Sequence, residues 1–342
     1  MLKLPISRLD ELFSLINGER TLYLPLEENN MVYFEQWSPE AVIRIDILNT
    51  VKSPKDFFFP VAEDIAAFKV SGKEIEIEDI RNPIEPFALF GIRACDAESL
   101  NLLDRVFLDE QCEFTDTFYQ SRRQSSIVIT TACSKPEETC FCGVFDIDAT
   151  NPGGDISTWL IDDTLYWKSQ TEKGSELTEK VKGLFVQASE AEIANQQEKT
   201  KELLQKLPFK DLNLEDFTGD ALMETFNSLK WTEMCRTCLS CGTCTFICPT
   251  CHCYDIQDFD TGSKIQRLKC WDSCMYSDFT LMAHGNPRTS TLERFRQRYM
   301  HKLIYFPDNN NGLYACVGCG RCVQKCPISM NIVKVIRELA RQ

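Results

Sequence analysis

Residues 238–249 read Cys238-Leu-Ser-Cys241-Gly-Thr-Cys244-Thr-Phe-Ile-Cys248-Pro249. The same pattern returns near the C-terminus as Cys316-Val-Gly-Cys319-Gly-Arg-Cys322-Val-Gln-Lys-Cys326-Pro327. Both match C-x-x-C-G-x-C-x-x-x-C-P. In such a run the first three cysteines bind irons of one 4Fe-4S cube, and the fourth turns to the other cube of the pair. The duplicated pattern therefore predicts two 4Fe-4S clusters.

This rule gives each predicted cluster four thiolates drawn from both motifs. The ligands expected for the first cluster are Cys238, Cys241, Cys244 and Cys326. Those expected for the second are Cys316, Cys319, Cys322 and Cys248. The alternative is a zinc site or a set of disulfides. Structural zinc usually takes two separated cysteine pairs, so the close spacing favours the cubes. The glycine after the second cysteine lets the backbone pass close to the cube.

Length and composition place the chain among intracellular metalloproteins. Its 342 residues are enough for two or more domains. The N-terminus lacks the apolar core of a signal peptide, and no run of about eighteen apolar residues predicts a membrane span. The chain has 18 cysteines. Reduced cysteines that are arranged in motifs indicate metal binding. We therefore expect a cytoplasmic protein of an anaerobic setting.

The charge is distributed unevenly along the chain. Residues 233–342 carry 14 Lys and Arg against 9 Asp and Glu, whereas residues 1–232 carry 23 against 42. A positive segment suits clusters that are formally anionic, and it favours their reduced form. The acidic remainder argues against a nucleic-acid partner.

Residues 1–170 are predicted to form an α/β domain. The strands expected from apolar runs are 22–26, 31–35, 87–92, 126–130 and 164–168. A helix is expected to follow the third of these runs, with Asp96 as its N-cap.

Two cysteines follow buried strands of this domain, at the point where each strand ends. Cys95 comes after 87–92, and Cys133 after 126–130. Ligands of open α/β sheets collect beyond the carboxyl ends of the strands. With Cys140 and Cys142 of the nearby Cys-Phe-Cys, these residues make four ligands for a possible third cluster. The alternative is four buried apolar cysteines, since free cysteine is often buried.

The rest of the chain is predicted to be mainly helical. Residues 171–232 form a charged connector with helices at 190–207 and 220–230. In 233–342, helices are expected at about 272–283, at 290–305 behind the capping box of Ser290 and Glu293, and from 332 behind Asn331. A long helical insertion between the cysteine motifs predicts an α-helical ferredoxin-like domain rather than the small β-hairpin kind.

The helix at 290–305 carries four basic residues: Arg294, Arg296, Arg298 and Lys302. A solvated surface is the favoured interpretation; compensation of cluster charge and docking of an acidic partner are the alternatives. No G-x-G-x-x-G follows a strand and no Walker-type phosphate loop occurs. We therefore expect no nucleotide or flavin site on this chain.

Five further cysteines surround the predicted clusters: Cys235, Cys251, Cys253, Cys270 and Cys274. They could pack beside the cubes, bind a further metal or form a redox-active thiol site, and packing is favoured. The chain's three histidines form no recognisable triad or zinc-hydrolase motif.

Several quoted segments occur here in one order: Phe90-Gly-Ile-Arg-Ala-Cys-Asp96, Cys133…Cys140-Phe-Cys142, Cys248-Pro-Thr-Cys-His-Cys253, Trp271-Asp-Ser-Cys274, His301-Lys302 and Cys316-Val-Gly-Cys-Gly-Arg-Cys322. Over about 85–342 the chain resembles the family that contains the sulfhydrogenase β subunits and the dicluster electron-transfer subunits of anaerobic sulfite reductases. Arg-Ala-Cys-Asp together with Cys-Phe-Cys is the most specific part, since many families share the ferredoxin motifs.

The resemblance implies an electron-transfer subunit without catalytic residues of its own. A neighbouring FAD subunit would exchange hydride with NAD(P)H, and a sirohaem sulfite reductase, a nickel–iron hydrogenase or a heterodisulfide-reductase-like module would be the catalytic partner. The resemblance also favours the third cluster. One alternative is a thiol or heterodisulfide reductase that uses Cys251, Cys253 or Cys274. A redox sensor is another, but no DNA-binding element is visible.

Overall fold

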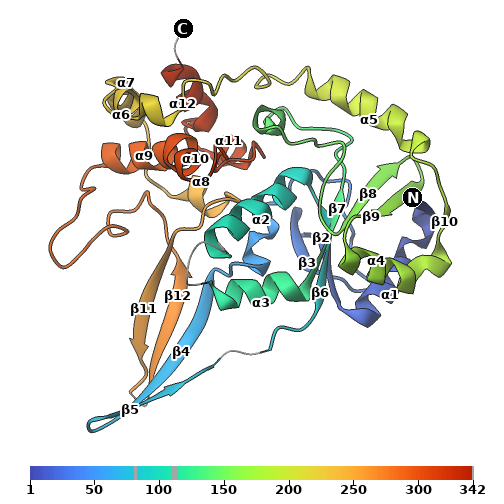
Figure 1. Cartoon of the computed structure of the whole chain (residues 1–342), viewed down its shortest axis with the longest axis horizontal. Coiled ribbons are helices and arrows are strands. Elements are labelled where there is room, and N and C mark those ends of the chain that lie inside the picture. Colours follow the sequence, from blue (N-terminus) through green and yellow to red (C-terminus); the bar gives the residue numbers. More distant parts are fainter. Residues whose placement is uncertain (81–82, 109–114, 263, 341–342) are drawn as a thin grey trace.

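The computed structural model describes residues 1–80, 83–108, 115–262 and 264–340. These residues form a mixed α/β body with an eight-stranded sheet in the order β10-β1-β9-β8-β7-β6-β2-β3. A second, four-stranded sheet has the order β11-β12-β4-β5. Figure 1 shows the second sheet as an arm that extends from the body, with helices of the C-terminal part of the chain near its base.

The larger sheet is parallel at its centre and antiparallel at both sides. Strands β2, β6, β7 and β8 pair in parallel, and the outer pairs are antiparallel. Its strands are β1 (Leu2–Pro5), β2 (Thr21–Glu28), β3 (Met31–Gln36), β6 (Phe87–Ile92), β7 (Ser126–Thr131), β8 (Ile156–Ile161), β9 (Thr164–Ser169) and β10 (Val186–Gln187). The strands predicted at 22–26, 31–35, 87–92, 126–130 and 164–168 are confirmed.

Helices cover both faces of this sheet. They are α1 (Leu9–Glu19), α2 (Ala94–Phe107), α3 (Thr117–Ser125) and α4 (Glu172–Val181). Side chains of β6 alternate between the two faces, as the strand period requires. Phe90 belongs to the core under α1 and α4, and Leu89 to the core under α2 and α3. Burial on both faces explains why this strand reads as one continuous apolar run.

The smaller sheet joins distant parts of the chain. It consists of β4 (Ala62–Ser71), β5 (Glu74–Glu78), β11 (Tyr254–Asp260) and β12 (Ile265–Trp271). Strand β12 pairs antiparallel with β4. Buried Lys269 on β12 lies 3.2 Å from Glu63 of β4 and 2.9 Å from Asp116 at the start of α3. The segment between the two cysteine motifs is therefore anchored on the N-terminal part of the chain.

The remaining helices connect the body to the cysteine motifs and surround them. They are α5 (Ala191–Leu204), α6 (Leu222–Phe226), α7 (Lys230–Cys235), α8 (Thr243–Phe246), α9 (Thr291–Met300), α10 (Phe306–Asn309), α11 (Arg321–Lys325) and α12 (Ile332–Leu339). A π-helical segment, His301–Tyr305, joins α9 to α10. Trp231, Phe295, Tyr299 and Ile336 lie in the core of this part of the molecule.

Some local predictions are confirmed and others are wrong. The capping box of Ser290 and Glu293 opens α9, and Asn331 caps α12. The helix predicted at 272–283 is wrong, because these residues form turns after β12. Asp96 does not cap α2, which begins at Ala94 after Arg93. The Asp96 carboxylate instead accepts a hydrogen bond from Arg321. The helix predicted at 220–230 is divided into α6 and α7.

Candidate iron–sulfur sites

The two cysteine motifs adopt the same backbone shape. In each motif the third and fifth residues have positive φ: Ser240 and Gly242 at 52° and 73°, and Gly318 and Gly320 at 58° and 78°. This left-handed conformation turns the chain between successive cysteines and starts the short helices α8 and α11. The two copies of the sequence motif therefore share one backbone conformation.

The second motif lies against the Cys-Phe-Cys segment of the body. A Cβ added at Gly318 would lie 2.5 Å from the backbone of Phe141, and one at Gly320 would lie 2.5 Å from the carbonyl oxygen of Thr139. Phe141 N–H donates a 2.9 Å hydrogen bond to Gly318 O. Only glycine fits this close approach of two backbones.

The first cavity is lined by the four cysteines expected for the first cluster. They are Cys238, Cys241, Cys244 and Cys326. Phe295 and Tyr299 of α9 and Met275 form its inner wall. Cys241 is exposed, whereas the other three cysteines are half-buried. The thiols thus surround a space that is close to the molecular surface on one side.

The second cavity is lined by the four cysteines expected for the second cluster. They are Cys248, Cys316, Cys319 and Cys322. Burial raises the pKa of the Cys316 thiol to about 12 and also raises that of Cys322. Thiols of this kind become thiolates when a bound cation displaces their protons.

Two buried cations face the second cavity. Lys302 Nζ lies 3.4 Å from Cys248 Sγ and donates hydrogen bonds of 2.7 Å to Thr250 Oγ1 and to Ala315 O. Arg298 donates from Nη2 to Cys244 O at 3.0 Å. Burial opposes the charge of Lys302, but the neighbouring Cys248 and Cys251 outweigh it and raise the lysine's pKa. Lys302 therefore stays protonated at neutral pH.

The third cavity contains four cysteines of the α/β body. They are Cys95, Cys133, Cys140 and Cys142. Cys95 lies in the first turn of α2 after β6, and Cys133 follows β7, at the carboxyl edge of the parallel strands. Burial raises the pKa of the Cys140 and Cys142 thiols to about 12. The four residues that sequence reasoning grouped are thus brought together.

Two buried arginines stabilise the region around the third and second cavities. Arg93 donates to the carbonyl oxygens of residues 45, 47, 48, 131 and 132 and lines the third cavity. Arg321 binds Asp96 through two hydrogen bonds of 2.6 and 2.7 Å, and both side chains are 2% exposed. This ion pair links the neighbour of Cys322 to the neighbour of Cys95. Gly318 and Cys319 line both cavities.

The donor sets fit 4Fe-4S clusters. Each cavity presents the four cysteines expected for its cube, the number of thiolates that such a cube takes, and Cys319 of the second set also lines the third cavity. Ser240 Oγ at the first cavity and Arg298 Nε and Nη1 at the second are buried without a hydrogen-bond partner. Sulfides of a cube accept hydrogen bonds, which would satisfy these donors. Among the described residues, no three His, Cys, Asp or Glu side chains gather as a site for a single metal ion.

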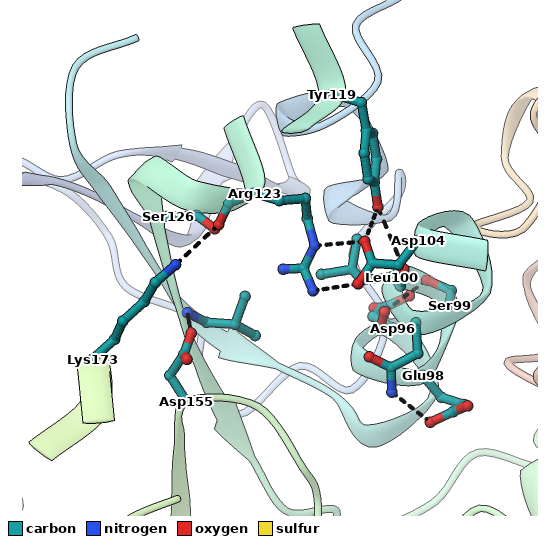
Figure 2. A network of polar contacts seen from close by, with 12 residues as sticks. Asp96, Glu98, Ser99, Leu100, Asp104, Tyr119, Arg123, Ser126, Asp155 and Lys173 are labelled. Carbon is teal, nitrogen blue, oxygen red and sulfur yellow. Dashed lines mark hydrogen bonds and ion pairs between the residues drawn. The ribbon is translucent and has the colours of Figure 1, made fainter. Parts of the chain in front are cut away.

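A further cavity of about 600 Å³ lies elsewhere in the body, between α2, α3 and the loop before β8. Several of its charged groups have partners within the body, as Figure 2 shows. Arg123 binds Asp104 at 2.7 Å, Lys173 donates to Gln124 O at 2.9 Å, and Asp155 accepts from Val128 N–H at 2.8 Å. This cavity is polar and has no cysteine in its described lining.

Sequence reasoning missed the buried cations around the thiols. The basic residues of 290–305 are mostly not a solvated surface: Arg294, Arg298 and Lys302 are buried. Arg296 stacks on Phe226 at 3.6 Å. Lys55, 2% exposed, donates to Cys251 O at 2.8 Å. One of these cations could have been identified from the sequence, because Arg321 directly precedes the motif cysteine Cys322.

The five further cysteines around the motifs line none of the three cavities in the described part of the chain. Cys235 packs in the core around Trp231, and Cys270 lies on β12. Cys251 lies against Cys248, and Cys253 against Cys274.

No helix among the described residues is long and apolar enough to cross a membrane. The model of the 4Fe-4S dicluster domain matches residues 237–330, a range that contains both cysteine motifs from Cys238 to Cys326. No solved structure matches the chain. The chain is 31% identical to Sulfhydrogenase 2 subunit beta of Pyrococcus furiosus over 331 residues, which cover 96% of this chain and 95% of that protein. The chain therefore belongs to the sulfhydrogenase β-subunit family and carries a 4Fe-4S dicluster domain at its C-terminal end.

Proposed function

We propose that this iron–sulfur electron-transfer subunit relays single electrons through three cubes. The observation that carries the proposal is the arrangement of three four-cysteine cavities in one molecule. The second and third share Gly318 and Cys319, and Cys244 of the first lies on α8, which Cys248 of the second follows closely in the chain. Cofactors at such short separations pass electrons one at a time, and the protein sets their potentials.

The proposed ligands follow the lining of the cavities. Cluster 1 is bound by Cys238, Cys241, Cys244 and Cys326. Cluster 2 is bound by Cys316, Cys319, Cys322 and Cys248. Cluster 3 is bound by Cys95, Cys133, Cys140 and Cys142. In this proposal residues 1–170 hold cluster 3, 171–232 connect, and 233–342 form an α-helical ferredoxin-like domain for clusters 1 and 2.

The side chains contribute charge, hydrogen bonds and exclusion of water. A cube supplies a one-electron redox centre when bound. Lys302 and Arg298 place two buried positive charges at the wall of cavity 2. Positive charge favours the reduced form of an anionic cofactor. Tyr299 and Phe295 shield the inner side of cavity 1.

We further propose that the chain works inside an anaerobic oxidoreductase complex. Its relative is named as the beta subunit of a sulfhydrogenase, a name that indicates other subunits. The partners proposed here are a catalytic redox subunit together with an FAD- and NAD(P)H-binding subunit. The catalytic partner is a sirohaem sulfite reductase, a nickel–iron hydrogenase or a heterodisulfide-reductase-like module.

A reduction experiment on the full chain tests the relay. Protein purified without oxygen is mixed either with NADH and NADPH or with titanium(III) citrate, a one-electron donor. We expect titanium(III) to bleach the visible absorbance of the cubes and the nicotinamides to leave it unchanged, because the hydride acceptor belongs to a partner subunit. Direct bleaching by a nicotinamide would contradict this division of labour.

Cluster 3 has a separate test. In the variant Cys140→Ser, Cys142→Ser we expect iron to fall by about four per chain, since a cube contains four irons. Cys270→Ser, which changes a cysteine outside the three cavities, is the control and should keep its iron. Equal iron in the double variant and the wild type would refute cluster 3 while leaving the other two standing.

A further inference from the structure

Two cysteines outside the three cavities are held together at the base of the β11–β12 hairpin. Cys253 directly precedes β11, and Cys274 follows β12. Tyr254 pairs with Trp271 at the end of the ladder, and Asp272 N–H donates a 3.0 Å hydrogen bond to Cys253 O. The antiparallel pairing thus places two cysteines that are distant in sequence side by side.

The two thiols are in direct contact. Cys253 and Cys274 share a hydrogen bond between their sulfurs, and Cys274 N–H also donates to the Cys253 sulfur. These bonds, with the nearby charges of Lys302 and Lys55, lower the pKa of Cys253 to about 6. Both cysteines are partly exposed. A low-pKa thiolate beside a second accessible thiol is the usual environment of a redox-active pair.

The pair lies beside the proposed path between clusters 1 and 2. Ser273 Oγ is 2.7 Å from Thr245 Oγ1 on α8, the helix that contains Cys244 and precedes Cys248. Met275, next to Cys274, lines cavity 1. The hairpin base is therefore attached directly to the segment that carries ligands of both clusters.

We propose that Cys253 and Cys274 form a redox-active dithiol–disulfide couple that exchanges electrons with the cubes and reacts with disulfide substrates. The proposal rests on the proposed relay, because the cubes supply the electrons. A disulfide substrate oxidises the pair: the Cys253 thiolate attacks one substrate sulfur and expels a thiolate. Cys274 then attacks Cys253, and the second substrate thiolate leaves. Two reduced cubes return one electron each, and two protons from solvent restore both thiols.

The test uses full-length protein purified without oxygen. Oxidised glutathione is the disulfide, and peptide mapping after alkylation detects a bond between Cys253 and Cys274. We expect this bond to form, with release of two molecules of glutathione per chain. The oxidised protein is then titrated with methyl viologen radical, a one-electron donor. The wild type should take up two more electrons per chain than Cys253→Ser, which lacks the attacking thiolate, because a disulfide is a two-electron acceptor. Cys274→Ser should release one glutathione per chain and keep the other as a mixed disulfide on Cys253.

Cys270→Ser is the matched control, since Cys270 lies on the same hairpin and should leave the electron count at the wild-type value. Absence of the Cys253–Cys274 bond, or equal electron uptake by wild type and Cys253→Ser, overturns the couple. Iron content separates the two proposals. Iron-replete protein without the couple leaves the relay intact, whereas iron-free protein contradicts the relay and with it electron delivery to the pair.

Discussion

Replacement of Lys302 by Met should lower the reduction potential of cluster 2. The lysine is 3% exposed, so water screens its charge little. Its Nζ lies 3.4 Å from Cys248 Sγ, one of the proposed ligands of this cluster. Met keeps much of the side-chain volume but removes the positive charge that favours the reduced, more negative cube.

The size of the effect follows from Coulomb's law. The added electron is spread over the cube, so its mean distance from Nζ exceeds the contact distance to sulfur. At about 7 Å and an effective dielectric constant of about 20, a unit charge contributes about 2.4 kcal/mol. For a one-electron couple this corresponds to about 100 mV. We therefore expect the potential of cluster 2 to fall by about 100 mV.

Potentiometric titration followed by electron paramagnetic resonance measures this shift. Lys302→Arg keeps the charge and should stay close to the wild-type potential, whereas Lys334→Met removes a charge from an exposed position on α12 and should change it little. Lys302→Met also removes one hydrogen-bond donor from Thr250 Oγ1 and one from Ala315 O, so iron content is measured in each variant. An iron-replete Lys302→Met protein with the potential of the Lys334→Met control would refute the electrostatic role.

Two further predictions concern the junction between the cysteine motifs and the body. Arg321→Met leaves the Asp96 carboxylate buried without its partner and should reduce stability by about 3–5 kcal/mol. Adding Asp96→Asn should recover part of this loss in urea unfolding followed by tryptophan fluorescence; equal midpoints for the single and double variants would contradict the pairing. Gly320→Ala combines a φ of 78° with a Cβ 2.5 Å from Thr139 O, and such backbone strain alone costs roughly 1–3 kcal/mol. We expect it to lose iron, while Gly183→Ala, with no atom within 4 Å of the added Cβ, should not; full iron in Gly320→Ala would show that the close approach is dispensable.

Local sequence patterns predicted the parts of the structure that have a local cause. The run at 87–92 is apolar throughout because both of its faces are buried, and the strand ends located Cys95 and Cys133. The pairing of β12 with β4 had no such signal, since it joins segments about two hundred residues apart and few residues of either strand are fully buried. The residues after β12, 272–283, were wrongly predicted to form a helix, because the sequence did not reveal the hairpin that they follow.

The burial of basic side chains was the second feature that could not be decided from the sequence. A helix periodicity separates apolar from polar faces, but it does not distinguish a polar face in water from one turned towards a cofactor. A solvated surface was therefore the favoured interpretation for Arg298 and Lys302, with compensation of cluster charge as an alternative, and the two side chains are 2% and 3% exposed at the wall of cavity 2. The contact between Cys253 and Cys274 likewise depends on the hairpin register.

The central claim is that three sets of cysteines bind three cubes. Its most direct measurement is the iron and acid-labile sulfide content of the full chain, purified without oxygen. We expect about twelve of each per chain, four for each cube. A folded protein that is colourless, or that carries zinc in place of iron at these cysteines, would contradict the account.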